Sequence, residues 1–211
     1  MTNLYIVGAG GLGRGLAATL EKEKKSVSED FNQMYFVDDA KYKEYVNGIF
    51  VKHNLEELLE IQEKCLVINA MGSPEMRKSI QHNLSKNTNL SFPNFIDSDV
   101  KLNAHIKMGE GNIISRGVVF STNIEIGDFN LIHFNCTVGH DVKLKNFNCI
   151  YPLVSLSGYT DIGNNNMIGT NSSTLPRVRL KNNIIVGANT LINRDILDQK
   201  TVIGSPAREI K

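Results

Sequence analysis

A histidine and an aspartate stand side by side in the second half of the chain, in the sequence Gly139-His140-Asp141. Histidine titrates near neutral pH, so an imidazole can accept a proton from an attacking amine or hydroxyl. An adjacent carboxylate can hold one tautomer of the ring and stabilise its protonated form. The pair therefore predicts a proton-transfer site, with His140 as the general base and Asp141 as its support.

A second candidate site lies at the start of the chain, where glycines follow the apolar segment 3–7. The run Gly8-Ala9-Gly10-Gly11-Leu12-Gly13 has the spacing G-x-G-x-x-G, which lets the backbone approach a phosphate at a helix N-terminus. Asp38 follows at about the distance where dinucleotide-binding folds place a ribose-binding carboxylate. Taken alone, the loop fits a nicotinamide-dependent enzyme or a tight turn without a ligand.

Strand and helix patterns alternate through residues 1–97. We expect strands at 3–7, 34–37, 65–70 and 92–96, helices near 12–24 and 74–86, and an amphipathic segment at 55–62. Alternation of this kind indicates a parallel α/β sheet. A domain of this length is short for a complete dinucleotide fold with a catalytic partner.

An aliphatic residue recurs at every sixth position in the second half of the chain. The row from 126 to 186 is Ile126, Ile132, Val138, Leu144, Ile150, Leu156, Ile162, Ile168, Thr174, Leu180 and Val186, and it extends back to Leu102. A period of six is the hexapeptide signature of a parallel β-helix, with three hexapeptides in each triangular coil. The period therefore predicts that residues 102–191 form about five coils, within a domain of residues 98–211. We expect the glycines that follow many of these residues, and several asparagines, to adopt positive φ at the corners.

The composition excludes several classes of function. The chain is 41% hydrophobic and 21% charged with a formal net charge of +1, so no strong field attracts nucleic acid or an anionic membrane. No apolar run approaches the ~20 residues of a membrane span, and no signal peptide is evident, so we expect a cytoplasmic protein. Three scattered cysteines predict neither a disulfide framework nor a zinc site, and we expect no metal.

Taken together, the motifs resemble one family. The segments YIVGAGGLGRG, FVDD, GHD and VIGSPAREI are similar to the bacterial sugar acetyltransferases of the PglD/NeuD type, and the resemblance covers nearly the whole chain. It implies a left-handed β-helix, a homotrimer with active sites at subunit interfaces, and acetyl-CoA as the acetyl donor. It also implies that the first domain holds a nucleotide-linked sugar and not NAD.

The resemblance also implies roles for individual residues. His140 is the expected base, Asp141 its support, and the Gly158 N–H the donor that stabilises the oxyanion. The expected nucleotide contacts are Gly8, Ala9, Gly10, Gly11, Asp38, Asp39 and Gly72, and the expected sugar contacts are His133 and Asn135. Coenzyme A is expected along Gly158, Gly169 and Ala188, with its phosphates near Arg208, Arg177 or Arg194.

Two positions depart from the family pattern, because many relatives have histidine where this chain has Leu12 and Cys149. Leu12 leaves open which residue makes a contact with the nucleotide or sugar, and Cys149 leaves open whether an accessory contact exists near the thioester. We expect N-acetylation of a nucleotide-linked amino sugar for surface glycan synthesis, with O-acetylation of sialic acid or a related sugar as the alternative. A β-helix that serves only as a scaffold is a third possibility, although no repetitive outer row of threonines is present.

Overall fold

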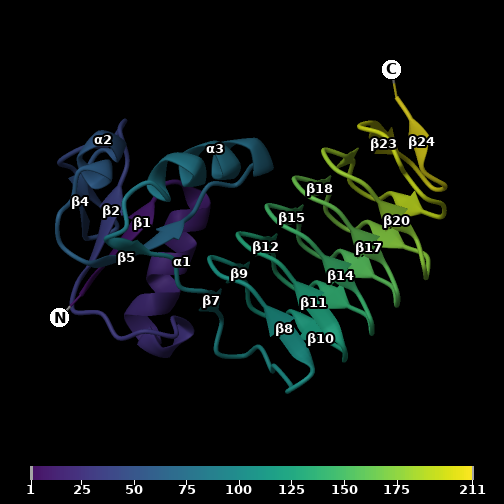
Figure 1. The fold of residues 1–211 in the computed structure, drawn as a ribbon, viewed down its shortest axis with the longest axis horizontal. Coiled ribbons are helices and arrows are strands. Elements are labelled where there is room, and N and C mark those ends of the chain that lie inside the picture. Colours follow the sequence, from purple (N-terminus) through teal and green to yellow (C-terminus); the bar gives the residue numbers. More distant parts are fainter. Residues whose placement is uncertain (1, 211) are drawn as a thin grey trace. The chain divides into compact units, whose positions relative to one another are not determined.

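The structure, a computed structural model, describes residues 2–210 (Figure 1). The chain divides into two compact units, Met1–Phe95 and Ile96–Lys211. No helix among the described residues is long and apolar enough to cross a membrane.

The first unit is built on a six-stranded sheet with the order β3-β4-β2-β1-β5-β6. Its strands are β1 (Asn3–Val7), β2 (Met34–Val37), β3 (Tyr45–Val46), β4 (Ile49–His53), β5 (Cys65–Asn69) and β6 (Leu90–Ser91). Its helices are α1 (Gly11–Lys22), α2 (Leu55–Leu59) and α3 (Pro74–Leu84), with a 3₁₀ turn, η1 (Lys24–Ser26). All strand pairs are parallel except β3 with β4.

The position of β1 decides where this unit can bind a ligand. β1 pairs with β2 on one side and β5 on the other, and Val7 lies level with Val37 and Asn69. The loops after these three strands therefore leave the same edge of the sheet, on both sides of the point where the strand order reverses. Parallel sheets bind ligands at such switch points.

The structure differs from the sequence prediction at β3 and β4, which were not expected. Asn47 and Gly48 join these strands with φ of 48° and 82°, and Asn-Gly with positive φ is the usual signal of a two-residue hairpin. The segment predicted as a strand at 92–96 is also shorter. Its end forms β7 (Phe95–Ile96), and β6 lies before it.

The second unit is a left-handed parallel β-helix. The hexapeptide row predicts the coil, and the family resemblance implies its left hand. Its neutral face consists of β10 (Val119–Phe120), β13 (Thr137–Val138), β16 (Ser155–Leu156), β19 (Ser173–Thr174) and β22 (Leu191–Ile192). Its charged face consists of β8 (Ile106–Met108), β11 (Ile124–Ile126), β14 (Lys143–Leu144), β17 (Asp161–Ile162) and β20 (Arg179–Leu180). Its apolar face consists of β7, β9 (Ile113–Ile114), β12 (Leu131–Ile132), β15 (Cys149–Ile150), β18 (Met167–Ile168), β21 (Ile185–Val186), β23 (Thr201–Ile203) and β24 (Arg208–Glu209).

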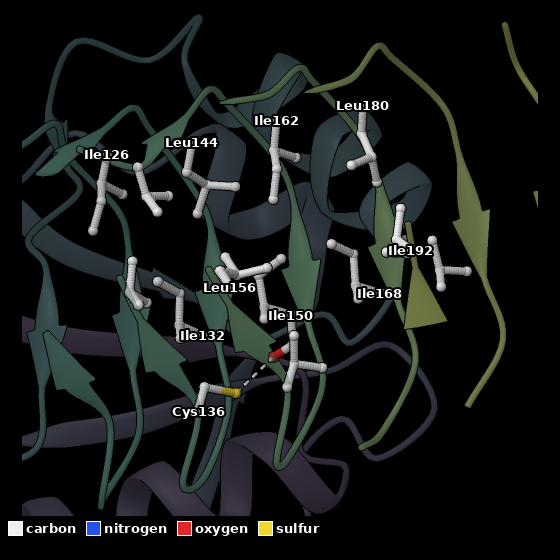
Figure 2. Packing of buried hydrophobic residues seen from close by; sticks show 14 of the residues in the cluster. Ile126, Ile132, Cys136, Leu144, Ile150, Leu156, Ile162, Ile168, Leu180 and Ile192 are labelled. Atoms are coloured by element: carbon white, nitrogen blue, oxygen red, sulfur yellow. Dashed lines mark hydrogen bonds between the residues drawn. The ribbon is translucent and has the colours of Figure 1, made fainter. Parts of the chain in front are cut away.

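The aliphatic row forms the core of the β-helix. Figure 2 shows members of the row pointing into the coil, each stacked on the equivalent residue of the next coil, such as Ile126, Leu144 and Ile162. This packing removes the side chains from water, which is the main driving force for folding. The row ends at Met108, because Leu102 is 45% exposed.

The corners of the coil correct the expectation about glycine. A residue other than glycine adopts positive φ at every sixth position from Asn123 to Asn189, with φ between 54° and 68°. None of the glycines that follow the aliphatic row does; at Gly127, for example, a Cβ would lie 2.0 Å from Asn146 Oδ1 of the next coil. Of the asparagines expected at positive φ, Asn165 and Asn183 have it, whereas Asn146, Asn164 and Asn182 accept hydrogen bonds from backbone N–H groups one coil earlier.

These positive-φ residues define three corners. Corner I, between the neutral and charged faces, carries Asn123, Asp141, Tyr159 and Arg177. Corner II, between the charged and apolar faces, carries Phe129, Phe147, Asn165 and Asn183. Corner III, between the apolar and neutral faces, carries Asn135, Leu153, Asn171 and Asn189.

A second asparagine row lies inside the coil and is fully buried. Asn112, Asn130, Asn148 and Asn166 succeed one another at 18-residue spacing, and each side-chain oxygen of the first three accepts the backbone N–H of the next asparagine at 2.9 Å. Buried polar groups are tolerated only when they are hydrogen-bonded, and this row meets that requirement from coil to coil.

Candidate active site

The candidate base is presented at corner I. His140 lies between β13 and β14, and its side chain is 52% exposed. Its Nδ1 lies 2.8 Å from Asp141 Oδ2, and Asp141 Oδ1 accepts a longer hydrogen bond, 3.4 Å, from the side chain of Asn123. The hydrogen bond with His140 is the main cause that lowers the pKa of the Asp141 carboxyl below its ordinary value. An ionised carboxylate therefore faces Nδ1, which leaves Nε2 as the nitrogen available to a substrate.

Gly158 lies beside this nitrogen, one coil further on. A Cβ at Gly158 would lie 2.6 Å from His140 Nε2, so the imidazole occupies the space that a side chain would need. The Gly158 carbonyl accepts the N–H of Arg177 at 3.0 Å, whereas no acceptor for the Gly158 N–H is found within residues 2–210. A proton acceptor and an unused backbone donor thus meet on the outside of corner I.

Two further side chains pack onto this group. The ring of Tyr159 lies perpendicular to the His140 imidazole, with 5.0 Å between the ring centroids. The guanidinium of Arg177 lies over the Tyr159 ring, 4.2 Å from its centroid. Arg177 was considered from the sequence as a ligand for the phosphates of coenzyme A, whereas in the structure its guanidinium stacks on this tyrosine. The tyrosine itself was not predicted as part of the site.

The residues expected to bind the sugar lie at another corner of the same chain. His133 and Asn135 belong to corner III, which β13 separates from His140. His133 Nδ1 accepts the N–H of Phe134 at 3.0 Å, and burial lowers the pKa of its imidazole. A single chain therefore does not bring His133 and Asn135 together with the His140 pair.

The residues expected to bind coenzyme A divide in the same way. Gly169 and Ala188 are neighbours at corner III, because a Cβ at Gly169 would lie 2.6 Å from the Ala188 nitrogen, whereas Gly158 is at corner I. Arg208 lies in β24 at the last coil and is exposed, and Arg194 lines a cavity of about 350 Å³ near the same end. In one chain these residues do not form a continuous binding site.

The glycine loop of the first unit is held by the acidic residue that the sequence placed beside it. Gly8 has φ of 100°, and Gly13 must lack a side chain because a Cβ there would lie 1.9 Å from the Gly8 carbonyl oxygen. The Ala9 N–H donates to Asp38 Oδ2 at 2.9 Å. Open space surrounds Gly10 and Gly11, so the loop is accessible at the N-terminus of α1.

The other predicted nucleotide contacts lie at the same edge of this sheet. Gly72 follows β5 and also faces open space. Asp39 uses Oδ1 to accept the Leu55 N–H at 2.8 Å, at the first residue of α2, so part of its role is structural. Lys41, which was not predicted, places its ammonium 3.0 Å from the Ala9 carbonyl oxygen. A basic residue two positions after the FVDD segment was the signal that could have identified it.

The cysteines and the metal-binding residue types form no site in the described part of the chain. Cys65, Cys136 and Cys149 are buried and free of disulfides, and burial raises the pKa of Cys136 to about 11. Among residues 2–210, no three histidine, cysteine, aspartate or glutamate side chains are grouped so that they could hold a metal ion.

Comparison with known proteins supports the resemblance inferred from the motifs. Residues 3–84 match the sequence model of the PglD N-terminal domain. Over 99% of this chain and 98% of the other, the fold is similar to the acetyltransferase domain of PglB from Neisseria gonorrhoeae FA1090 in complex with acetyl coenzyme A, at 28% identity and a TM-score of 0.87. No curated protein matches the sequence closely enough to add a relative.

Two more distant structures share the fold. A variant of perosamine N-acetyltransferase from Caulobacter crescentus, in complex with CoA and GDP-perosamine, is 23% identical over 100% of this chain and 98% of the other, with a TM-score of 0.89. WeeI from Acinetobacter baumannii AYE is 19% identical over the whole of both chains, with a TM-score of 0.86. The combination of both units, and not the β-helix alone, is therefore common to these proteins.

Proposed function

We propose that this sugar acetyltransferase of the PglD/NeuD type transfers an acetyl group from acetyl-CoA to the amino group of a nucleotide-linked sugar, in the cytoplasm, for surface glycan synthesis. The observation that carries the proposal is the arrangement at corner I, where Asp141 holds Nδ1 of His140 at 2.8 Å and the other imidazole nitrogen lies against Gly158. The likeness to the acetyl-CoA-bound domain of PglB supports the same donor.

The proposed reaction needs no covalent enzyme intermediate. The nitrogen of the sugar amine attacks the thioester carbonyl carbon and forms the C–N bond, while His140 Nε2 removes a proton from the amine. The carbonyl oxygen gains charge and is stabilised by the free N–H of Gly158, a contribution of about 3–4 kcal/mol for a well-placed donor. The C–S bond then breaks, and the imidazolium returns the proton to the departing thiolate of coenzyme A.

The assay for this proposal measures thiol release from acetyl-CoA with a panel of UDP-, dTDP- and GDP-linked amino sugars and sialic acids. Treatment of the product with hydroxylamine distinguishes the two acceptor types, because an O-acetyl ester is cleaved and an N-acetyl amide is not. N-acetylation is expected. An ester product would favour the alternative, and no thiol release with any acceptor by the folded protein would contradict both acetyltransferase assignments.

For the nucleotide-linked sugar, we propose the switch point of the first unit as the binding site. The backbone N–H groups of Gly10 and Gly11 lie in open space at the N-terminus of α1 and can meet a phosphate, and Gly72 lies on the opposite side of the switch point. Gly8 and Ala9 donate their N–H groups to Val37 and Asp38, so these two residues shape the loop around the ligand. Asp39 retains one carboxylate oxygen beyond its bond to α2, and Asp38 lies beside the loop. Carboxylate oxygens can accept hydrogen bonds from ribose hydroxyls or a base N–H.

Replacing Asp38 with alanine is expected to weaken nucleotide-sugar binding at least about tenfold, because the Asp38 carboxylate accepts the N–H groups of Ala9, Ala40 and Lys41 and so holds the glycine loop against the segment after β2. Calorimetric titration with the substrate identified by the assay measures this change. Asp30→Ala removes an exposed carboxylate of the same unit and should leave the affinity unchanged. An Asp38→Ala protein whose affinity stays within about threefold of wild type would remove Asp38 from the site.

The separation of the predicted residues between two corners supports a homotrimer. Corners I and III are the two edges of the neutral face. If three copies turn this face toward a three-fold axis, corner I of each copy meets corner III of the next. His133, Asn135, Gly169 and Ala188 of one copy then lie beside His140 and Gly158 of another, and coenzyme A, with Arg208 near its phosphates, fits between the two copies.

The outward residues distinguish the neutral face from the other two. The outward row of the charged face is Lys107, Glu125, Lys143, Asp161 and Arg179, which alternate in sign as expected for a surface in water. The corresponding row of the neutral face is Val119, Thr137, Ser155, Ser173 and Leu191. On the apolar face, the outward residues Ile113, Leu131 and Cys149 are already buried within the single chain. Met167 and Ile185 continue that row and are not buried, so the apolar face is open only toward its end. The neutral face is the one whose uncharged outward row is at least partly exposed in every coil, and we propose it as the contact between copies.

Placing a charge on the neutral face tests this assembly. Ser173→Glu is expected to shift a trimer toward monomers, because each copy would bury a carboxylate without a partner. Sedimentation velocity measures the masses, and thiol release should fall together with the trimer. Lys143→Glu adds the same side chain to the charged face and should leave the mass unchanged. A wild-type monomer with full activity would contradict the shared site.

A further inference from the structure

Tyr159 occupies a corner position between the base and an arginine. Its backbone N–H donates to the His140 carbonyl at 2.9 Å, and the Arg177 N–H donates to the Gly158 carbonyl at 3.0 Å. Because equivalent residues lie 18 positions apart, Tyr159 belongs to the coil after that of His140 and before that of Arg177. The backbone thus sets the tyrosine between the two side chains.

The ring of Tyr159 closes a side of the imidazole that the other contacts leave open. Asp141 binds Nδ1 at 2.8 Å, and Gly158 adjoins Nε2. Tyr159 adds a perpendicular ring with its centroid 5.0 Å from the centre of the imidazole. A half-exposed histidine at a corner would otherwise exchange between rotamers, and a general base is effective only within a narrow geometry.

Arg177 fixes the orientation of the tyrosine. Its guanidinium stacks over the Tyr159 ring at 4.2 Å from the centroid, and an arginine on an aromatic face restricts the rotation of both side chains. Tyr159 is itself 45% exposed, so its ring is held by its contacts at the corner and not by a surrounding core. Its hydroxyl is also one of the groups that lower the pKa of the Asp141 carboxyl, so both ends of the tyrosine side chain face the His140 pair.

We propose that Tyr159, oriented by Arg177, is a positioning residue that holds the imidazole of His140 in the pose from which it accepts the substrate proton. The inference rests on the proposed function, in which His140 is the base. It assigns Arg177 to the support of the base and not to the phosphates of coenzyme A.

The kinetic test compares Tyr159→Ala with Tyr159→Phe. The alanine variant should lose about tenfold in kcat, the size of effect that one perpendicular aromatic contact can supply, with little change in KM for acetyl-CoA. The phenylalanine variant keeps the ring and should stay within about threefold of wild type. Phe147→Ala is the matched control, because Phe147 has the same positive φ at corner II and stacks on Phe129 there. It should leave kcat unchanged.

A double-mutant cycle separates positioning from a general loss of structure. In a His140→Ala background, adding Tyr159→Ala should not lower the residual rate further, because the tyrosine acts through the imidazole. A second tenfold loss in that background would overturn the proposal, and so would a phenylalanine variant as slow as the alanine variant. Arg177→Met should lower kcat in the same direction but less.

A measurement that needs no activity keeps this inference separate from the proposed function. In protein labelled with ¹³C at histidine Cε1, the His140 resonance, assigned by its loss in His140→Ala, senses the ring current of Tyr159. Tyr159→Ala should move this resonance, whereas Tyr159→Phe and Phe147→Ala should not. If the resonance moves but no acceptor is acetylated, the proposed reaction is wrong and the contact between Tyr159 and the His140 imidazole still holds. A His140 resonance that is insensitive to Tyr159→Ala would contradict the proposal that Tyr159 positions the imidazole.

Discussion

Replacing His140 with alanine is expected to lower kcat by about 10²–10⁴-fold while leaving the affinity for coenzyme A nearly unchanged. General-base catalysis supplies about this factor, and the reacting amine has no other proton acceptor at corner I with the geometry of Nε2. Asp141 cannot substitute, because its low pKa makes its carboxylate a weak base and its Oδ2 atom is bound to the imidazole. Thiol release at saturating substrates measures kcat, and calorimetry measures coenzyme A binding.

His105→Ala is the control for this variant. His105 lies at the start of the corner I row, is exposed, and is three coils away from Gly158, so its removal should leave kcat and the affinity unchanged. Two results would contradict the role of His140. One is an alanine variant within about threefold of wild type, and the other is a loss of activity explained entirely by a loss of coenzyme A binding.

The period of the sequence was sufficient to predict the β-helix, because every coil must bury the same positions. The row from Ile126 to Val186 is buried as expected. The corner conformation was not predictable in the same way. Phe129, Phe147, Leu153 and other bulky residues adopt positive φ, since the coil geometry and the coil-to-coil hydrogen bonds impose a conformation that their side chains do not favour.

The candidate base and its support were predictable because they are adjacent in sequence. Gly158 came from the resemblance, and its position against Nε2 of His140 depends on the 18-residue return of the coil. Tyr159 was overlooked for the same reason, since nothing in its local sequence marks it as a neighbour of the histidine. The placement of His133 at corner III shows that closeness in sequence does not ensure closeness in space when a strand intervenes.

In the first unit, the sequence predicted most of the strands of the sheet but not the order in which they pair. The glycine loop and Asp38 were identified from their spacing, and the hydrogen bond from Ala9 shows why they occur together. The hairpin of β3 and β4 was missed although Asn47-Gly48 is a strong turn signal, because its first strand has only two residues. The partner of Asp39, the start of α2, could not be known without the fold.

Asn148→Ala is expected to be the most destabilising of the substitutions considered, with a loss of about 3–5 kcal/mol in the free energy of unfolding. The Asn148 amide donates to the Gly163 carbonyl at 2.8 Å and to Asn130 Oδ1 at 3.0 Å, and its oxygen accepts the Asn166 N–H at 2.9 Å. Alanine leaves these buried groups without partners, and each unsatisfied group costs about 1–3 kcal/mol. Thermal unfolding at a fixed protein concentration should show a lower Tm, by on the order of 10 °C.

Asn182→Ala tests whether burial, and not the asparagine row as such, causes the loss. Asn182 also accepts a backbone N–H from the preceding coil, that of Asn164 at 2.7 Å, but it is exposed. Water can replace the lost oxygen there, so the free energy of unfolding should fall by no more than about 1 kcal/mol. If the two variants unfolded at the same temperature, the buried row would not be what holds successive coils in register, and the stability of the coil that carries His140 would rest on its aliphatic core alone.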